Sequence, residues 1–457
     1  MIAIVGAGMG GLAAAAFLSR RGRRVVVLEA RSGPGGLASS FEAGGLRFDS
    51  GPYVLLDRPG LEWAFHEIGE ELSSHLDLIR IDDIYQVEIE EGPVVSISAS
   101  LEKTAAAAEA LQSGAGAAYA RFVDDVARVY EDLRPLLTIS RPGAGALLRS
   151  GAWRHVPYLL RTLSGVLNRA RLPEPLSRAL SIWTHVAGQH PGEAPSPMAF
   201  VSALIHRHGT FVPRGGLGRI PLALEKIARA AGAEFRYGAR VRKILASGGR
   251  VTGIDVDGER IAVDAIVSDV GGLRTYLELL DDTPESLRRR LDALPLQTPG
   301  VCAYLAIEGT PSPPFLKFRL PRQGACRLLI LPGLVDPSLA GTARLLGPVE
   351  MEWSRQAGPE GQSGYLDALR SEPWWKNGIV DARMVASRIP SQWGTDFNLF
   401  RDSMNPVMTA KFMRQGRLPH RSPAVKGLFL AGSSTHPGQW VSFCAISGVL
   451  AAKELAC

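Results

Sequence analysis

Three glycines and a glutamate near the start of the chain have the types and spacing that hold a dinucleotide. Gly6, Gly8 and Gly11 follow a short apolar run, and Glu29 ends the next one, VVVLE. In this pattern the first glycine permits a tight turn, the second lets the backbone approach a diphosphate, and the third lets a helix pack closely on a strand. Free N–H groups at the helix N-terminus bind the phosphates, and the carboxylate accepts hydrogen bonds from the ribose. The predicted binding residues of this stretch are Gly6, Gly8, Met9, Gly10, Gly11 and Glu29.

The segment after Glu29, EARSGPGGLASSF, favours FAD over NAD as the dinucleotide. It supplies a second glycine pair, which lets the backbone approach a longer ligand again. The later sequence FDSGP returns the chain to the side of the same ligand. The residues predicted to bind FAD in this region are Ala30, Arg31, Gly35, Gly36, Leu37, Gly51 and Pro52.

Two strands and a helix must position these residues. The run IAIV is typical of a short buried strand, and the alanine-rich stretch after the glycines predicts a helix that ends at Gly22. A signal peptide would carry its basic residues before the apolar run, whereas here they follow it. A membrane-spanning helix is excluded because the four glycines between Gly6 and Gly11 would destabilise it. The opening therefore predicts a strand–helix–strand unit.

The composition is that of a globular protein with two or three domains. The chain has 457 residues and a formal net charge of +6, which is small for this length and does not indicate nucleic-acid binding. The four cysteines are far apart and form no CxxC, so neither a disulfide framework nor a zinc site is expected, and a reducing cytoplasm fits. The pairs His206/His208 and His185/His190 lack a matching set of cysteines or carboxylates, so no metal site is predicted.

Three blocks of the chain resemble the FAD-dependent phytoene desaturase family, within the amine-oxidase-like flavoproteins. They are the glycine unit, residues 209–270 beginning GTFVPRGGLGRIPLALEKIARAAGAEF, and the C-terminal GLFLAGSSTHPGQWVSFCAISGVLAAKEL. The last block continues from Ser433 into Thr-His-Pro-Gly, as in the desaturases, whereas many amine oxidases have an acid after Ala-Gly. It then departs from the family, which usually has small residues and proline where this chain has Gln439-Trp440-Val441. A bulky Trp440 would reshape the substrate channel.

The resemblance implies further contacts with FAD. In the family, the backbone at the position of Val241 packs against the adenine. A strand at 428–431 leads to Gly432 and Ser433, and a final helix from about Val441 would direct its N-terminus at the flavin pyrimidine edge. Negative charge accumulates there on reduction, and the helix dipole favours it. The candidate flavin-facing residues are His436 and Trp440; for His436 the alternative is a turn-stabilising role, and no general base stands out.

The expected fold class is α/β, with a Rossmann-like FAD-binding domain and a discontinuous α+β substrate domain. A sheet that begins at residue 2 and ends near residue 431 makes the FAD-binding domain discontinuous. We assign to it residues 1–60, 208–285 and 410–457. The substrate domain then takes residues 61–207 and 286–409.

Residues 141–178 are the candidate segment for contact with a membrane surface. The segment is rich in arginine, and its apolar residues recur at helical spacing: Val156, Leu159, Leu160, Leu163, Val166 and Leu167. A helix with an apolar stripe and an arginine face can lie among the headgroups of anionic lipid. The alternative is a helix that caps the substrate domain while its arginines are merely solvated. The expected location is the cytoplasm, with or without peripheral contact at the inner face of the membrane.

The resemblance implies an oxidoreductase of carotenoid biosynthesis. It would remove two hydrogens from adjacent saturated carbons of a hydrophobic polyene such as phytoene, with hydride passing to flavin N5. One alternative is a flavin amine oxidase or a tailoring oxidase for a smaller substrate. Another is a flavin-free lipid-binding protein of the GDP-dissociation-inhibitor kind, against which the intact glycines and Glu29 argue. The electron acceptor and the oligomeric state are left open by the sequence.

Overall fold

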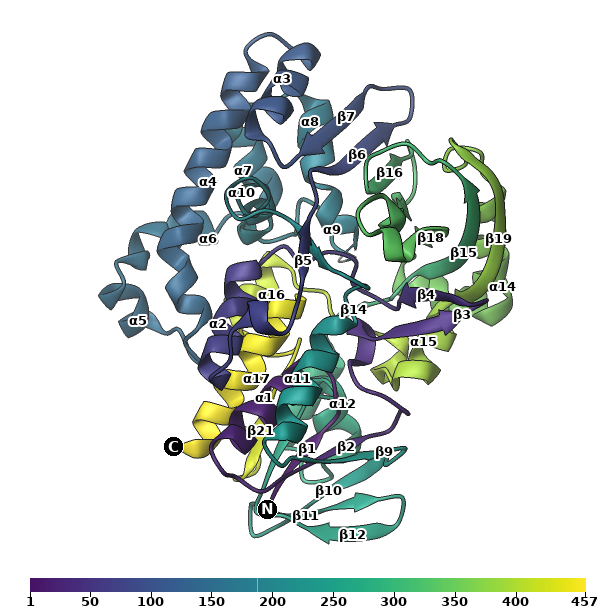
Figure 1. The fold of residues 1–457 in the computed structure, drawn as a ribbon. Coiled ribbons are helices and arrows are strands. Elements are labelled where there is room, and N and C mark those ends of the chain that lie inside the picture. The colour runs from purple at the N-terminus through teal and green to yellow at the C-terminus, as the bar shows by residue number, and fades with distance from the viewer. Residues whose placement is uncertain (187) are drawn as a thin grey trace.

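The computed structural model describes residues 1–186 and 188–457 and arranges them in two parts, each built on one large sheet (Figure 1). The first part contains both termini and a five-stranded parallel sheet. Its strands, in order across the sheet, are β21 (Leu428–Leu430), β13 (Ala265–Ser268), β1 (Ile2–Val5), β2 (Val25–Glu29) and β9 (Glu234–Tyr237). The inner strands read as unbroken apolar runs because both faces of the sheet are covered.

Helices cover one face of this sheet. They are α1 (Met9–Arg20), α11 (Arg219–Ala230) and α17 (Val441–Ala456), and α2 (Arg58–Ile68) packs on α17 and α1. Figure 1 shows α1 and α17 side by side, and the two are in contact along their length. A side chain on Gly448 would come within 2.0 Å of the Gly10 carbonyl oxygen, so the small residues allow the two helix backbones to meet. Alanines 13–16 of α1 are completely buried, and Ala13 lies at this contact, beside Gly448.

The opposite face of the parallel sheet packs on a three-stranded antiparallel sheet. This smaller sheet consists of β10 (Val241–Ser247), β11 (Arg250–Val256) and β12 (Glu259–Ala262). Its inward residues, such as Ile244 and Ile254, form one core with Ala3 and Val5 of β1. The turn signals at Gly248-Gly249 and Asp257-Gly258 join its strands, as the sequence predicts.

The second part is built on a seven-stranded mixed sheet. Its strands, in order, are β19 (Ile379–Arg388), β15 (Val301–Gly309), β18 (Thr342–Gly347), β17 (Arg327–Ile330), β16 (Leu316–Leu320), β6 (Asp83–Ile89) and β7 (Val94–Ser98). Only β16 and β6 pair in parallel among them. This pairing joins a strand from the first quarter of the chain to a hairpin from its later half.

The remaining helices and strand pairs surround these sheets. The longer helices of the second part are α3 (Leu101–Leu111), α4 (Ala115–Leu137), α10 (Phe200–Arg207), α14 (Met351–Ser371) and α15 (Pro390–Phe397). The molecule also contains α8 (Glu174–Leu180), α9 (Ile182–Val186), α12 (Gly272–Arg274), α13 (Glu285–Asp292) and α16 (Ala410–Gln415). Two-stranded sheets pair β3 (Ser40–Ala43) with β4 (Leu46–Asp49), β5 (Leu78–Arg80) with β8 (Phe211–Pro213), and β14 (Leu296–Gln297) with β20 (Asn405–Pro406).

The expectation of an amphipathic helix with one apolar stripe within 141–178 is wrong. The segment forms the short helices α5 (Ala144–Arg149), α6 (Val156–Leu159) and α7 (Leu163–Ala170), a 3₁₀ turn at Ala152–His155 and the start of α8. Helix α6 ends at Leu159, and Thr162 caps α7, because its side chain accepts a hydrogen bond from the Gly165 amide. The apolar residues of α7 lie in the core, whereas Leu148, Trp153 and Leu160 are more than half exposed. In the described part of the chain, none of the helices has the length and apolarity needed to cross a bilayer.

Candidate cofactor and substrate site

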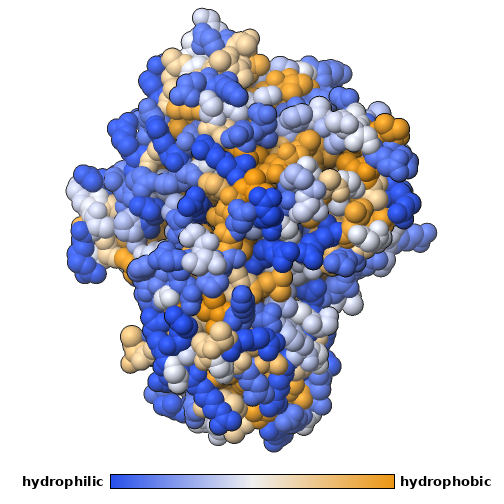
Figure 2. Space-filling model, in the orientation of Figure 1, coloured by the Kyte–Doolittle hydropathy of each residue, from blue (hydrophilic) through white to orange (hydrophobic). Residues whose placement is uncertain are grey.

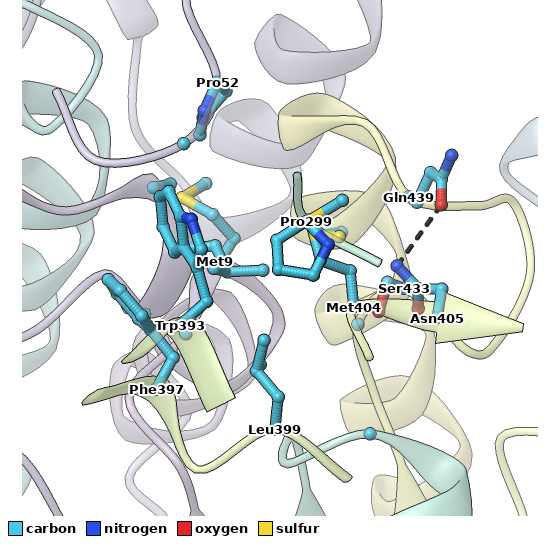
Figure 3. Close-up of a pocket in the computed structure, with 18 of the residues that line it drawn as sticks. Met9, Pro52, Pro299, Trp393, Phe397, Leu399, Met404, Asn405, Ser433 and Gln439 are labelled. Carbon is cyan, nitrogen blue, oxygen red and sulfur yellow. Dashed lines mark hydrogen bonds between the residues drawn. The ribbon is translucent and has the colours of Figure 1, made fainter. Parts of the chain in front are cut away.

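A large cavity opens where the carboxyl ends of the parallel strands meet the second part of the molecule. In doubly wound sheets, ligands bind at this edge, where the strand order changes direction. Figure 3 shows side chains from both parts converging there, with Met9 and Pro52 across from Trp393 and Phe397. The predicted residues that line the cavity are Gly6, Gly8, Met9, Glu29, Ala30, Arg31, Gly35, Gly36, Leu37, Gly51, Pro52, Val241, Gly432, Ser433, Trp440 and Val441.

The glycine turn between β1 and α1 has the geometry that a dinucleotide requires. Gly6 has a φ of +96°, a conformation that residues with side chains rarely adopt. Gly10 and Gly11 lie behind the cavity wall rather than in it; a Cβ on Gly11 would come within 2.1 Å of the Gly6 carbonyl oxygen. Helix α1 begins at Met9, and Gly8 provides no side-chain cap for its first N–H groups. Gly8 and Met9 bring the start of this helix to the cavity wall, where its N-terminus fits the diphosphate of FAD.

Glu29 is held in place at the end of β2. Its carboxylate accepts hydrogen bonds from the backbone amides of Ala7, at 2.7 Å, and Arg31, at 2.8 Å. The guanidinium of Arg31 donates to the Gly36 carbonyl and packs over the ring of Phe397, with 4.3 Å between the guanidinium carbon and the ring centroid. Burial lowers the pKa of Arg31. The acid thus lies at the cavity wall with its conformation already fixed.

Asp49 connects the glycine segment at 215–218 to the strand pair β3–β4. It is partly buried at the end of β4, and its carboxylate accepts hydrogen bonds from the amides of Leu217 and Gly218 and from the Ser40 hydroxyl. Burial raises the pKa of Asp49, while these donors lower it. The following residues, Ser50 to Pro52, bend into the cavity wall.

Arg344 ties this bend to the second part of the molecule. The side chain extends from β18 and is buried, and it donates to the carbonyl oxygens of Ser50 and Gly51, each at 2.9 Å. Tyr304 of β15 donates to the same Ser50 carbonyl at 2.9 Å. The predicted FAD-facing turn at Gly51 is therefore held by residues far away in the sequence.

The C-terminal block forms the other end of the cavity. Gly432 and Ser433 follow β21, and α17 begins at Val441, as the sequence predicts. Trp440 lines the cavity and stacks on Phe443, with ring centroids 4.8 Å apart. Cys444 also lines the cavity, and burial raises the pKa of its thiol, which disfavours the thiolate that a covalent flavin link would need.

His436 does not line the cavity, in contrast to the flavin-facing position expected of it. Its ring is largely buried, and Nε2–H donates to the Leu136 carbonyl of α4 at 2.9 Å. Burial lowers the pKa of His436 to about 4. A neutral ring that joins this turn to α4 fits the turn-stabilising alternative.

Asp57 is a cavity residue that connects three helices. Its carboxylate caps α2 through the Gly60 amide and also accepts hydrogen bonds from Tyr130 of α4 and Ser442 of α17. Burial raises the pKa of Asp57, and the three donors offset part of that rise.

Sequence reasoning missed several residues of the cavity wall. These are Asp57, Asp269, Arg274, Trp393, Phe397, Asn405 and Gln439. Figure 3 shows the hydrogen bond between Asn405 and Gln439, 3.2 Å long. Asp269 had a recognisable signal, because it directly follows the apolar run AIVS, which is typical of a buried strand. Trp393 and Phe397 of α15 had none, since they reach the site from a distant segment. Over the described residues there is no cluster that could hold a metal ion, and the side chain of His185 lies outside them.

Comparisons with known proteins agree with this geometry. The model of the flavin-containing amine oxidoreductase family matches residues 9–303. The chain is 28% identical to the zeta-carotene-forming phytoene desaturase of Myxococcus xanthus, over 99% of this chain and 93% of that protein. It is 30% identical to a phytoene dehydrogenase of Streptomyces griseus, over 99% and 94%. The crystal structure of an oxidoreductase from Methanosarcina mazei has a TM-score of 0.66, with 19% identity and 99% of each chain covered.

These matches extend over both parts of the molecule, and the family model alone takes in more than half of the chain. The chain therefore belongs to the family of flavin-containing amine oxidoreductases and is an FAD-dependent oxidoreductase.

Proposed function

We propose that this enzyme desaturates carbon–carbon single bonds of a hydrophobic polyene of the phytoene or carotenoid kind. The observation that carries the proposal is the apolar wall of the cavity beyond the glycine turn. Apolar side chains from both parts line it: Tyr53, Leu55, Trp183, Met198, Val201, Cys326 and Leu328. Such a wall binds a hydrocarbon chain by removing it from water, and the relatives named as phytoene desaturases support this substrate class.

The part built on the parallel sheet would bind FAD. The N-terminus of α1 would hold the diphosphate, Glu29 the ribose, and the start of β10 at Val241 the adenine. The uncapped N-terminus of α17 would lie at the pyrimidine edge and favour negative charge there. When bound, FAD supplies a hydride acceptor.

The part built on the seven-stranded sheet would bind the substrate. Its side chains exclude water and hold the reacting carbons against the flavin. Asp57 already accepts three hydrogen bonds from its own chain, so it is poorly suited to hold an ammonium group. This favours a hydrocarbon over an amine.

The first test is anaerobic. Protein loaded with FAD is mixed with liposomes that contain phytoene, and the absorbance of oxidised flavin is followed together with that of the product. Bleaching that accompanies a longer conjugated polyene is the expected result. Flavin that stays oxidised with phytoene but bleaches with putrescine would overturn the substrate assignment and leave the cofactor in place.

A variant of the apolar wall makes the test specific. V201D would place a carboxylate among buried apolar side chains of α10, so polyene-dependent bleaching should fall at least tenfold while FAD stays bound. The control is V380D, because Val380 is 86% exposed on β19. Equal bleaching rates for the two variants would exclude this wall as the substrate site.

We further propose that the enzyme takes its substrate from a membrane surface through residues 148–160. Four apolar residues of this segment are exposed, Leu148, Trp153, Val156 and Leu160, and exposed arginines at 149 and 154 lie between them. Aromatic and aliphatic side chains enter the headgroup region, and arginines attract anionic lipid.

Vesicle flotation tests this surface. The protein should float with phosphatidylglycerol vesicles and less with phosphatidylcholine vesicles, and the double variant W153E/L160E should reduce flotation at least tenfold. W353E is the control, because Trp353 is also exposed but lies on α14. If both variants float like the wild type, the segment is not the membrane contact.

A further inference from the structure

Asp269 lies at the centre of the glycine-lined end of the cavity. It follows β13, and its backbone N–H donates to the Val5 carbonyl at 2.8 Å. A Cβ on Gly8 would come within 2.5 Å of Oδ2, and one on Gly432 within 2.2 Å of Oδ1. The glycines of two separate segments therefore make room for this carboxyl group as well as for a ligand.

The carboxyl group of Asp269 competes with a diphosphate for the same donors. The N–H groups of Gly10 and Gly11, at the start of α1, face it. In the described part of the chain its Oδ2 is buried and has no hydrogen-bond partner. A buried carboxyl oxygen without a partner, beside the N-terminus of α1, marks a ligand contact that the protein alone leaves unfilled.

No cation balances this carboxyl group among its interacting neighbours in the described residues. The titratable groups that interact with it are Glu29 from β2 and the thiol of Cys444 from α17. Glycines at the start of α1 and directly after β21 lie against it: Gly8, Gly10, Gly11 and Gly432. Burial raises the pKa of Asp269 to about 7, and the charge of Glu29 raises it as well.

We propose that Asp269 is a cofactor-binding residue that contacts the FAD diphosphate as a neutral acid and takes one proton from solvent when FAD binds. The inference rests on FAD binding in this cavity. A carboxylate and a diphosphate beside the same N–H groups would repel each other, whereas a protonated carboxyl group donates its O–H to a phosphate oxygen.

The sign of the pH dependence follows from this competition. Below the pKa of free Asp269 the carboxyl group is already neutral, so FAD binds without proton uptake. Above it, each pH unit lowers the fraction of neutral acid tenfold and weakens binding by the same factor. With a pKa near 7, the Kd for FAD rises about 50-fold between pH 7 and pH 9.

The test is a titration of the FAD-free enzyme with FAD at pH 6 to 9, followed by quenching of flavin fluorescence. The wild type should show the 50-fold rise, whereas D269N should bind within threefold of one affinity at every pH. D269S is a second neutral variant in case the amide disturbs folding. Calorimetry in two buffers of different ionisation enthalpy should give close to one proton taken up per FAD at pH 8 for the wild type and none for the variants.

Two results would overturn the proposal. One is a flat pH profile for the wild type without proton uptake, which would mean that Asp269 binds as a carboxylate, for instance to ribityl hydroxyls. The other is an equal rise in D269N, which would assign the titration to another group. In both cases FAD still binds, so the cofactor assignment stands; absence of FAD binding at every pH would instead overturn that assignment.

Discussion

Single residues near the N-terminus made the cofactor site predictable, because their roles depend on local geometry. Gly6 needs its positive φ, Gly11 needs the absence of a side chain, and both requirements are visible in the spacing alone. His436 shows the limit of such reasoning. Its neighbours in sequence pointed to the flavin, but its ring binds the Leu136 carbonyl, three hundred residues away.

The role of Gly11, the third glycine of the turn between β1 and α1, can be tested by adding one methyl group. G11A places a Cβ 2.1 Å from the Gly6 carbonyl oxygen, so α1 must move away from β1, and the donors for the diphosphate move with it. We expect a loss of about 1–3 kcal/mol in stability and at least a tenfold weaker Kd for FAD, measured by thermal unfolding and fluorescence titration.

The matched control for G11A is G33A. Gly33 belongs to the same glycine-rich region, but a Cβ there would meet nothing within 4 Å. This variant should keep wild-type stability and FAD affinity. If both variants lose FAD equally, general glycine content rather than helix–strand contact would explain the effect.

At the scale of elements, helices and strands were predicted correctly where the pattern was local and glycine turns marked its ends. The three-stranded hairpin sheet and the start of α17 at Val441 follow from glycine turns and apolar runs. Residues 141–178 failed because helical spacing of apolar residues does not reveal breaks. Gly151, Thr162 and the left-handed Arg171 interrupt the segment, and α7 turns its apolar side into the core.

The turn between β21 and α17 should make the enzyme sensitive to acid. His436 joins this turn to α4, and His420 packs beside it; burial lowers the pKa of each ring to about 4. Both therefore bind protons more readily in the unfolded chain, near its ordinary pKa of about 6.5. The stability that they contribute is complete above that pH and is lost as the pH falls from 6.5 toward 4, by up to about 1.4 kcal/mol per pH unit for each ring.

A variant separates this contribution from general acid unfolding. H436Q keeps a donor for the Leu136 carbonyl but removes the titrating ring, so its thermal midpoint should fall less steeply below pH 6.5 than that of the wild type. H66Q, at an exposed position on α2, should follow the wild-type profile. Parallel curves for all three proteins would contradict the assignment.

At the scale of the whole molecule, the parallel sheet could be predicted from the sequence, whereas the seven-stranded sheet could not. The strands of the FAD-binding part carry recognisable motifs at the start, middle and end of the chain. The seven-stranded sheet depends on pairing β6 with β16 across more than two hundred residues, and no local pattern encodes that register. The assigned domain boundaries stay a prediction.

Arg344 should couple the unfolding of the two parts. R344M leaves the Gly51 carbonyl without its donor and removes a buried guanidinium that spans both parts, at an expected loss of about 2–4 kcal/mol. In the wild type, flavin fluorescence and circular dichroism should change at one guanidinium concentration. In R344M the flavin should leave first, whereas R383M, at an exposed position on β19, should keep the transitions together. Coincident transitions in R344M would show that other contacts provide the coupling.

The order of strands in the parallel sheet also constrains how the protein is made. A ribosome delivers β1 and α1 before β13, and β13 before β21 and α17. Until α17 emerges, the side of α1 that packs on it at Gly448 stays uncovered, and the cavity lacks its wall at Gly432 and Trp440. The nascent chain must therefore keep this apolar surface of α1 from aggregating until α17 is made. A complete FAD site exists only after residues 428–456 have left the ribosome.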